Sequence, residues 1–215
     1  MKSAMPYRGV ASPVQKAVLK GLFAAHPLAT FEAWRDTVLE LWRTAAHREE
    51  RYAAIALAGH RPYRVFQRLE MLPVYEEMIV TGAWWDYVDA VAVHLLGAEL
   101  LGRRPAAMKP VMLRWSTDAN LWRRRSSIIC QVSFKRETDL ELLYACIEPN
   151  LAGGDFFIRK AIGWALRQYA WSDPDEVRRY VSTNEARLSG LSRREALKNI
   201  GGAGQERSSS ATVSM

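Results

Sequence analysis

The stretch FEAWRDTVLELWRTA, residues 31–45, decides the fold class of the chain. Its apolar side chains recur every three or four residues, which is the spacing that gathers them on one side of an α-helix. Thr30 stands directly before the stretch and can cap the first helical turn through its hydroxyl. The apolar stripe consists of Phe31, Trp34, Val38, Leu39, Leu41 and Trp42. We therefore expect an amphipathic helix that packs against further helices.

Helical signals of the same kind continue along the chain, and no alternating strand pattern of useful length occurs. The motif SRRE at residues 192–195 is typical of a capping box, in which Glu195 would return to a cap at Ser192. The expected helices cover residues 12–25, 30–45, 48–59, 63–80, 84–101, 106–115, 118–133, 138–148 and 155–171, and two more begin at Asp173 and Ser192. The sequence predicts an all-α protein.

Periodicity alone allows two arrangements of these helices. Short joints and a spacing of about 35–40 residues per helix pair favour a HEAT-like solenoid of stacked antiparallel pairs. The pairs share no sharp sequence signature, so a globular helical bundle fits the same periodicity. We expect one domain over residues 1–200, followed by a disordered tail at 201–215, GGAGQERSSSATVSM, because the tail has little to bury.

The net charge of +7 is unevenly distributed along the 215 residues. Residues 1–102 hold 11 basic and 11 acidic side chains, whereas residues 103–215 hold 19 basic and 12 acidic ones, so the second half carries the whole excess. This pattern suits a polyanionic partner, although a basic surface that is merely solvated would look the same.

Several function classes find no support in the sequence. The start MKSAMPYRGV has no apolar run fit for a signal peptide, and no stretch of about 18 apolar residues occurs, so we expect a cytoplasmic protein without a membrane partner. No nucleotide-binding loop, hydrolase elbow or zinc-protease motif is present, and the four histidines follow no ligand pattern. We expect neither a cofactor nor a metal.

The stretch TGAWWDYVDA, residues 81–90, places two adjacent tryptophans close to two aspartates. On a helix, Trp85 and Asp89 point the same way because residues four apart share a face. A separate apolar row can form the core face, and it consists of Trp84, Val88, Val91 and Leu95. The pattern therefore sets an indole and a carboxylate together outside the core row, where a carboxylate is costly to bury unless it is paired or used.

A second unusual tryptophan lies in the stretch DFFIRKAIGWALRQYA, residues 155–170. Trp164 has Lys160 four residues before it, and Arg167 and Gln168 three and four residues after it. The apolar row of this helix is formed by Ile158, Ile162, Ala165, Leu166 and Tyr169. An indole on a basic face can stack on a sugar or a base. The alternative is a partly buried tryptophan that is shielded by the stems of long side chains.

A third basic stretch, DANLWRRRSSIICQVSFK, covers residues 118–135. We expect Arg124, Ser127 and Gln131 to form an outward polar row, opposite an inward face of Leu121, Trp122, Ile128, Ile129 and Val132. Arginine beside small hydroxyls suits contact with phosphate, because the guanidinium fork matches phosphate oxygens. A solvated arginine run is the alternative.

Taken together, four stretches resemble the AlkD-type DNA alkylation repair family, the HEAT-like DNA glycosylases. They are WWDYVD (84–89), NLWRRRSSIICQ (120–131), DFFIRKAIGWALRQYA (155–170) and LSGLSRREAL (188–197). The resemblance extends over nearly all of residues 5–200 and implies a HEAT-like solenoid with a concave, basic face that binds DNA. The start MPYRGV resembles the end of the family's N-terminal helix, which implies that part of a first helix is absent.

The resemblance also implies roles for individual residues. The family's essential carboxylate matches Asp89, its two site tryptophans match Trp85 and Trp164, and its site arginine matches Arg124. Lys160 and Arg167 would extend the contact with the DNA backbone.

The implied activity is that of a glycosylase that removes cationic N-alkylated purines from duplex DNA without a base-flipping pocket. We expect it to associate with nucleoid DNA and to act as a monomer, because a curved solenoid around a duplex needs no second copy. A helical-repeat protein that binds damaged or branched DNA without catalysis is the main alternative. A protein-binding HEAT scaffold is a third, but it would need an apolar groove in place of a basic one.

Overall fold

The computed structural model of the protein describes residues 5–200, and every regular element in that range is helical, which confirms the predicted all-α class. The α-helices are α1 (Ser12–Ala25), α2 (Phe31–Arg43), α3 (Arg48–Ala58), α4 (Leu72–Gly82), α5 (Trp85–Ala90), α6 (Pro105–Ser116), α7 (Leu121–Ile129), α8 (Leu140–Ile147), α9 (Phe156–Tyr169), α10 (Pro174–Thr183) and α11 (Gly190–Leu197). Four short 3₁₀-helices connect them: η1 (Arg61–Phe66), η2 (Leu69–Met71), η4 (Lys135–Glu137) and η5 (Glu148–Asn150). A π-helix, η3 (Val91–Leu101), continues α5.

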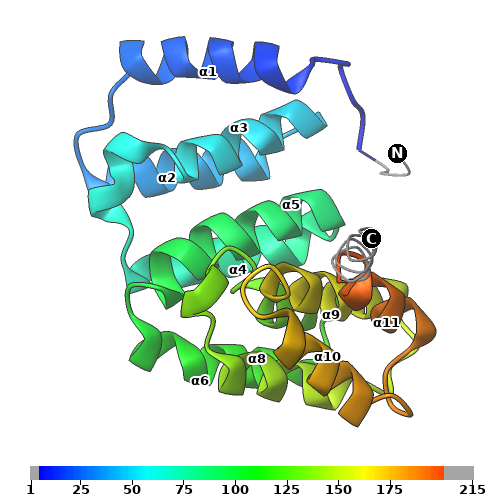
Figure 1. Ribbon diagram of the computed structural model, residues 1–215. Helices are drawn as coiled ribbons and strands as arrows, with labels where there is room; N and C mark the ends of the chain where they lie inside the picture. Colours follow the sequence, from blue (N-terminus) through cyan, green and yellow to red (C-terminus); the bar gives the residue numbers. More distant parts are fainter. Residues whose placement is uncertain (1–4, 201–215) are drawn as a thin grey trace, which may run out of the picture.

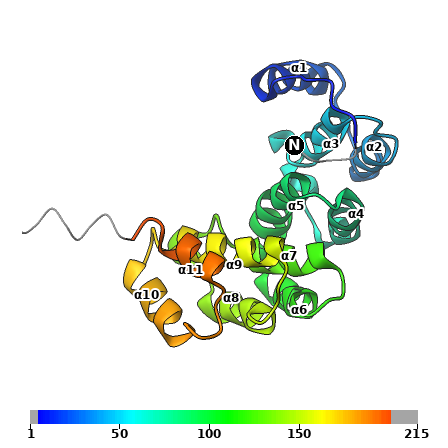
Figure 2. The same cartoon turned by 90° about the vertical axis from the view of Figure 1, so that its right-hand side faces the viewer.

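The helices are stacked in pairs, as in a helical repeat (Figure 1). Helix α2 packs against α3, α4 against η3, and α6 against α7. A row of helices continues from pair to pair, because α3 contacts α5, α5 contacts α7, α7 contacts α9, and α9 contacts α11. Figure 2 shows that the chain bends as it proceeds, so that α1 and α11 lie at opposite ends of an arch.

The helix that decided the fold class packs largely as its apolar stripe predicts. Phe31, Trp34, Val38 and Trp42 of α2 are buried, and the Thr30 hydroxyl accepts a hydrogen bond of 3.1 Å from the backbone N–H of Ala33. The predicted cap at Asp173 is also present, because its carboxylate accepts from the backbone N–H of Glu176 at 2.9 Å. Among residues 5–200, no helix has the length and apolar character needed to cross a membrane.

Two sequence predictions about the helices are wrong, and a third helix has the expected bounds but differs in its type. The single helix expected over residues 63–80 is divided into η1, η2 and α4, and the helix expected over 84–101 changes from α to π after Ala90. The capping box at Ser192 does not form, because α11 begins earlier and Ser189 is its cap. The Ser192 side chain is buried and donates to the carbonyl of Arg159 at 3.0 Å. Residues 1–4 and the predicted tail, 201–215, lie outside the described residues.

The π-helix approaches α7 very closely at one glycine. A Cβ atom at Gly97 would lie 1.9 Å from the carbonyl oxygen of Cys130, so no side chain fits there. π-Helical turns are rare and are often found beside functional sites. Here the π-helix begins directly after the segment that carries Asp89.

Candidate functional site

Helix α5 is attached to both neighbouring helices by ion pairs from its two aspartates. Asp86 pairs with Arg48 of α3 and also accepts a hydrogen bond of 2.6 Å from the Tyr52 hydroxyl. Asp89 pairs with Arg125 of α7. The two carboxylates of the WWDYVD segment therefore hold α5 in a fixed orientation between α3 and α7.

The pair formed by Asp89 and Arg125 has two parallel hydrogen bonds. Arg125 Nε donates to Asp89 Oδ1 and Nη2 donates to Oδ2, each at 2.7 Å, while Nη1 donates to the carbonyl of Phe157 at 2.6 Å. The side chains are only 15% and 6% exposed, respectively. Burial raises the pKa of the Asp89 carboxyl above its ordinary value, and the hydrogen bonds and positive charge of Arg125 oppose that shift. The pair has the bidentate arrangement, with two parallel N–H···O bonds, that arginine often forms with a carboxylate.

Asp89 and Arg125 face a pocket of about 350 Å³ between α5, α7, α9 and α11. Its lining also includes Trp85, Phe156, Phe157, Lys160, Trp164, Arg167 and Glu195. We call it the reaction pocket. Five of the predicted site residues, Trp85, Asp89, Lys160, Trp164 and Arg167, thus come together at one place although they are separated by up to about 80 positions in the sequence.

The two adjacent tryptophans of the WWDYVD segment have different surroundings, as predicted. Trp84 packs against the core, and its ring meets that of Phe157 edge-on with the centroids 6.2 Å apart. Trp85 is 40% exposed at the reaction pocket. Trp164 is partly buried on α9 and lines the same pocket. The pocket therefore places the largely buried carboxylate of Asp89 beside two indoles, those of Trp85 and Trp164.

The cations of the reaction pocket share an acidic partner. Lys160 Nζ lies 2.9 Å from one carboxylate oxygen of Glu195, and Arg167 Nη1 lies 2.6 Å from the other. The hydrogen bond from Lys160 lowers the pKa of the Glu195 carboxyl, and the charges of Lys160 and Arg167 lower it further. Gly163 lets α11 come this close, because a Cβ there would lie 2.5 Å from the Cβ of Glu195.

The outward polar row predicted on α7 is wrong for two of its three members. Ser127 and Gln131 are buried, at 2% and 4% exposure. Arg124 is partly exposed, but it is absent from the lining of the reaction pocket, and its Nη1 donates to the carbonyls of Asp118 and Ala119 at 2.6 and 3.1 Å. Its contact with phosphate stays a prediction, and that contact would have to replace these two backbone bonds.

Sequence reasoning missed the next arginine along the chain. Arg125 lies three residues after Trp122 and four before Ile129, and so occupies the inward face of α7. A buried arginine needs a buried anionic partner, and Asp89 was the carboxylate that needed a cation. The sequence indicated that each of these two residues needs a partner, but only the packing of α7 against α5 shows that they pair with each other. The role of Glu195 was also missed, because its local motif pointed to a helix cap.

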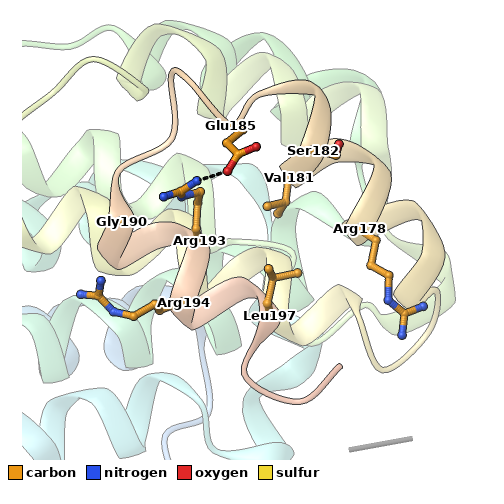
Figure 3. A pocket seen from close by; sticks show the side chains of 8 residues that line it. All are labelled: Arg178, Val181, Ser182, Glu185, Gly190, Arg193, Arg194 and Leu197. Carbon is orange, nitrogen blue, oxygen red and sulfur yellow. Dashed lines mark hydrogen bonds and ion pairs between the residues drawn. The ribbon is translucent and has the colours of Figure 1, made fainter. Parts of the chain in front are cut away.

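A separate hollow lies between α10 and α11 (Figure 3), with a volume of about 500 Å³. Its one carboxylate, Glu185, is paired with Arg193, and the guanidinium groups of Arg178 and Arg194 lie on opposite sides of it. No aromatic side chain from the described part of the chain lines it, so these residues offer neither a free carboxylate nor a stacking surface. Among residues 5–200, no group of three or more His, Cys, Asp or Glu side chains is placed to hold a metal ion.

Comparisons with known proteins agree on one family. The model of the family described as "DNA alkylation repair enzyme" matches residues 1–200. Among solved structures, a predicted DNA alkylation repair enzyme from Enterococcus faecalis is similar with a TM-score of 0.81 and 28% sequence identity, and the match covers 93% of this chain and 90% of that chain. A search of curated proteins found no match.

Proposed function

Because the chain belongs to the DNA alkylation repair enzyme family, we propose that it is a DNA N-glycosylase that releases cationic N-alkylated purines from duplex DNA. A role in DNA repair follows from the family. The reaction and the lesions, such as 3-methyladenine and 7-methylguanine, are our proposal. The observation that carries it is the buried carboxylate of Asp89, which faces a pocket flanked by two indoles.

Alkylation at a purine ring nitrogen leaves the base with a positive charge, so the base departs without first being protonated. As the glycosidic bond breaks, its electron pair goes to the base, which leaves as a neutral molecule. Positive charge then grows on the deoxyribose, and water adds to C1′ and loses a proton. A fixed carboxylate stabilises that growing charge. Asp89 is the group that supplies it here.

Arg125 fixes Asp89 in place and leaves part of it available. A carboxylate has about four lone-pair sites, and Arg125 uses one on each oxygen. The remaining sites can face the sugar and orient the attacking water. Because Arg125 is itself bonded to the Phe157 carbonyl, the pair does not need to reorganise during the reaction.

Trp85 and Trp164 would pack their ring faces against the deoxyribose of the damaged nucleotide. The negative face of an indole favours a nearby cation, by about 1–2 kcal/mol when water is excluded. Lys160, Arg167 and Arg124 would contact phosphates on either side of the lesion. For Lys160 and Arg167, this means sharing their charge between Glu195 and the DNA.

Recognition of the sugar and backbone in place of the base has consequences for selectivity. The reaction pocket, at about 350 Å³, need not enclose the base, so bulky adducts should be accepted as long as they leave the base cationic. Neutral lesions should react slowly, because they are poor leaving groups. Excision of a neutral damaged base at a rate comparable with that of 7-methylguanine would contradict the mechanism.

The decisive experiment measures release of 3-methyladenine and 7-methylguanine from methylated duplex DNA by the unaltered protein and by Asp89→Asn. We expect the variant to bind DNA but to release bases about 100- to 1,000-fold more slowly. Asp86→Asn is the matched control, because Asp86 also pairs with a buried arginine but does not line the reaction pocket.

If neither the unaltered protein nor the variants release bases while all of them bind duplex DNA, the chain would be a binding protein without glycosylase activity. Equal activity of Asp89→Asn and the unaltered protein would remove Asp89 from the mechanism.

A further inference from the structure

Another hollow, of about 740 Å³, adjoins the reaction pocket at Trp164. The two cavities share Asp89 and Trp164 as walls. We call this hollow the flanking pocket. Its distinctive side chains are Trp171, which follows α9, Gln168 of α9, and Lys135 at the start of η4. Its volume is within the range of about 300–1,000 Å³ that is typical of ligand-binding pockets.

We propose that the flanking pocket binds the nucleotide next to the lesion on the damaged strand, with its deoxyribose on the indole of Trp171 and its phosphate on Lys135. The proposal rests on the proposed function, because it is the continuation of a DNA strand that passes Asp89. The ligand is defined by its chemistry, which is a sugar ring with an adjoining phosphate.

The first argument is the state of Trp171. This indole is 71% exposed, more than either tryptophan of the reaction pocket, and no ring or cation among the described residues stacks on it. It follows the end of α9 and lies seven residues, or about two helical turns, beyond Trp164, and the two indoles border the same hollow. A tryptophan with a free face beside a DNA path is a stacking surface that tolerates any sequence.

The second argument is the distribution of charge. Lys160 and Arg167 in the reaction pocket are both bound to Glu195. Lys135 is exposed, and none of the carboxylates among residues 5–200 forms an ion pair with it. Among the lining residues of the flanking pocket, Asp89 is the one acidic side chain, and it is already paired with Arg125. Lys135 is therefore the cation at this site whose full charge is available to a phosphate.

The test uses duplex oligonucleotides with a single 7-methylguanine in three forms. One has an intact damaged strand, and in the other two this strand ends directly on the 5′ or on the 3′ side of the lesion. The proteins compared are the unaltered chain, Trp171→Ala, Trp171→Phe, Lys135→Ala and the control Arg136→Ala. Arg136 is an exposed neighbour with the same charge that does not line the flanking pocket. Each protein is measured for Kd, for the dependence of Kd on salt, and for single-turnover excision at saturation.

With the intact duplex, we expect Trp171→Ala and Lys135→Ala each to weaken binding about tenfold. Trp171→Phe should restore most of that loss, and Arg136→Ala should bind like the unaltered protein. Lys135→Ala should also lower the salt slope by about 0.9, which corresponds to one phosphate contact, whereas Trp171→Ala should leave it unchanged. The excision rate at saturation should stay the same in both, because neither side chain faces the reacting bond.

The truncated duplexes decide whether a neighbouring nucleotide is the ligand. With one of them, the nucleotide of the flanking pocket is absent, so the unaltered protein, Trp171→Ala and Lys135→Ala should bind equally. The proposal would be overturned if Trp171→Ala and Lys135→Ala bound both truncated duplexes more weakly than the unaltered protein does, or if they bound the intact duplex equally well. Failure of the unaltered protein to bind any duplex would also overturn it. Because Kd and the salt slope do not depend on excision, a protein that shows this pattern but releases no base refutes only the glycosylase activity.

Discussion

Replacement of Arg125 by methionine is the most informative single change at the reaction pocket. Methionine keeps an unbranched apolar stem on the inward face of α7 but removes the charged guanidinium group. Three hydrogen bonds are lost, two to Asp89 and one to the carbonyl of Phe157. Asp89 is left in a site where its side chain is only 15% exposed and where no other cation among residues 5–200 forms an ion pair with it.

The expected cost in stability follows from this burial. Removal of one partner from a buried ion pair costs about 3–5 kcal/mol, because the other charge remains without compensation. The residual exposure of Asp89 lets water relieve part of this cost, so we expect a loss of about 3 kcal/mol at pH 8. A domain of this size has a total stability of about 5–15 kcal/mol, and Arg125→Met should therefore remain folded.

The loss should depend on pH in a defined direction. Burial already raises the pKa of Asp89, and removal of Arg125 removes the hydrogen bonds and charge that oppose this shift. The folded variant then binds a proton more tightly than the unfolded chain, whose aspartate has a pKa of about 3.9. Stability falls as pH rises wherever the folded state holds the extra proton. The variant should therefore be closest to the unaltered protein near pH 5 and furthest from it at pH 8.

Chemical denaturation at pH 5 and pH 8 measures the stability effect, and single-turnover excision between pH 6 and pH 8.5 measures the effect on catalysis. Protonated Asp89 cannot stabilise a cation, so excision by Arg125→Met should be slow at pH 6 and should recover as pH rises. In the double variant Arg125→Met/Asp89→Asn, no charge is buried, and stability should return to within about 1–2 kcal/mol of the unaltered protein. A stability loss in Arg125→Met that is equal at both pH values would refute this view of the pair.

Two further predictions concern the contact between α9 and α11. Gly163→Ala should lower the free energy of unfolding by about 1–3 kcal/mol, because its methyl group would overlap Glu195 at 2.5 Å, and thermal or chemical denaturation measures this. Glu195→Gln should release Lys160 and Arg167 for the DNA backbone, so duplex binding should tighten and the salt slope should grow by up to about 0.9 for each phosphate contacted. Glu185→Gln is its control, since it removes the same charge from the hollow between α10 and α11; equal effects of the two would show that net charge alone is responsible.

Local patterns in the sequence were sufficient for most of the helices and for the residues that α5 contributes to the candidate site. Three- and four-residue spacing identified the buried face of α2, and the same spacing separated Trp85 and Asp89 from the core row that contains Val88. Asp173 before a proline was enough to locate the start of α10. These features depend on neighbours within one or two turns, which is the range over which sequence periodicity is informative. The residue roles that were assigned by family resemblance do not follow from such local patterns, and variants such as Asp89→Asn test them.

Contacts between distant helices were not predictable in the same way. Arg124 and Arg125 differ by about 100° around α7, and only the packing of α7 against α5 decides which of them meets Asp89. Glu195 satisfied a capping motif locally, yet its partners lie 28 and 35 positions away on α9. The apolar pattern gave no signal for the change to a π-helix after Ala90. The close approach of Gly97 in this π-helix to the backbone of Cys130 is evident only from the structure.

The protonation states of the two carboxyl groups in the reaction pocket account for the selectivity that we propose. A neutral damaged base departs readily only if an acid protonates it, and carboxylic acids are the usual donors in such sites. Neither carboxyl group of the reaction pocket is arranged for this. Glu195 is held as a carboxylate by two cations that lower its pKa, and Asp89 accepts from Arg125 through both of its oxygens. The pocket can therefore stabilise a cation but is poorly equipped to create one, so the positive charge has to arrive with the alkylated base.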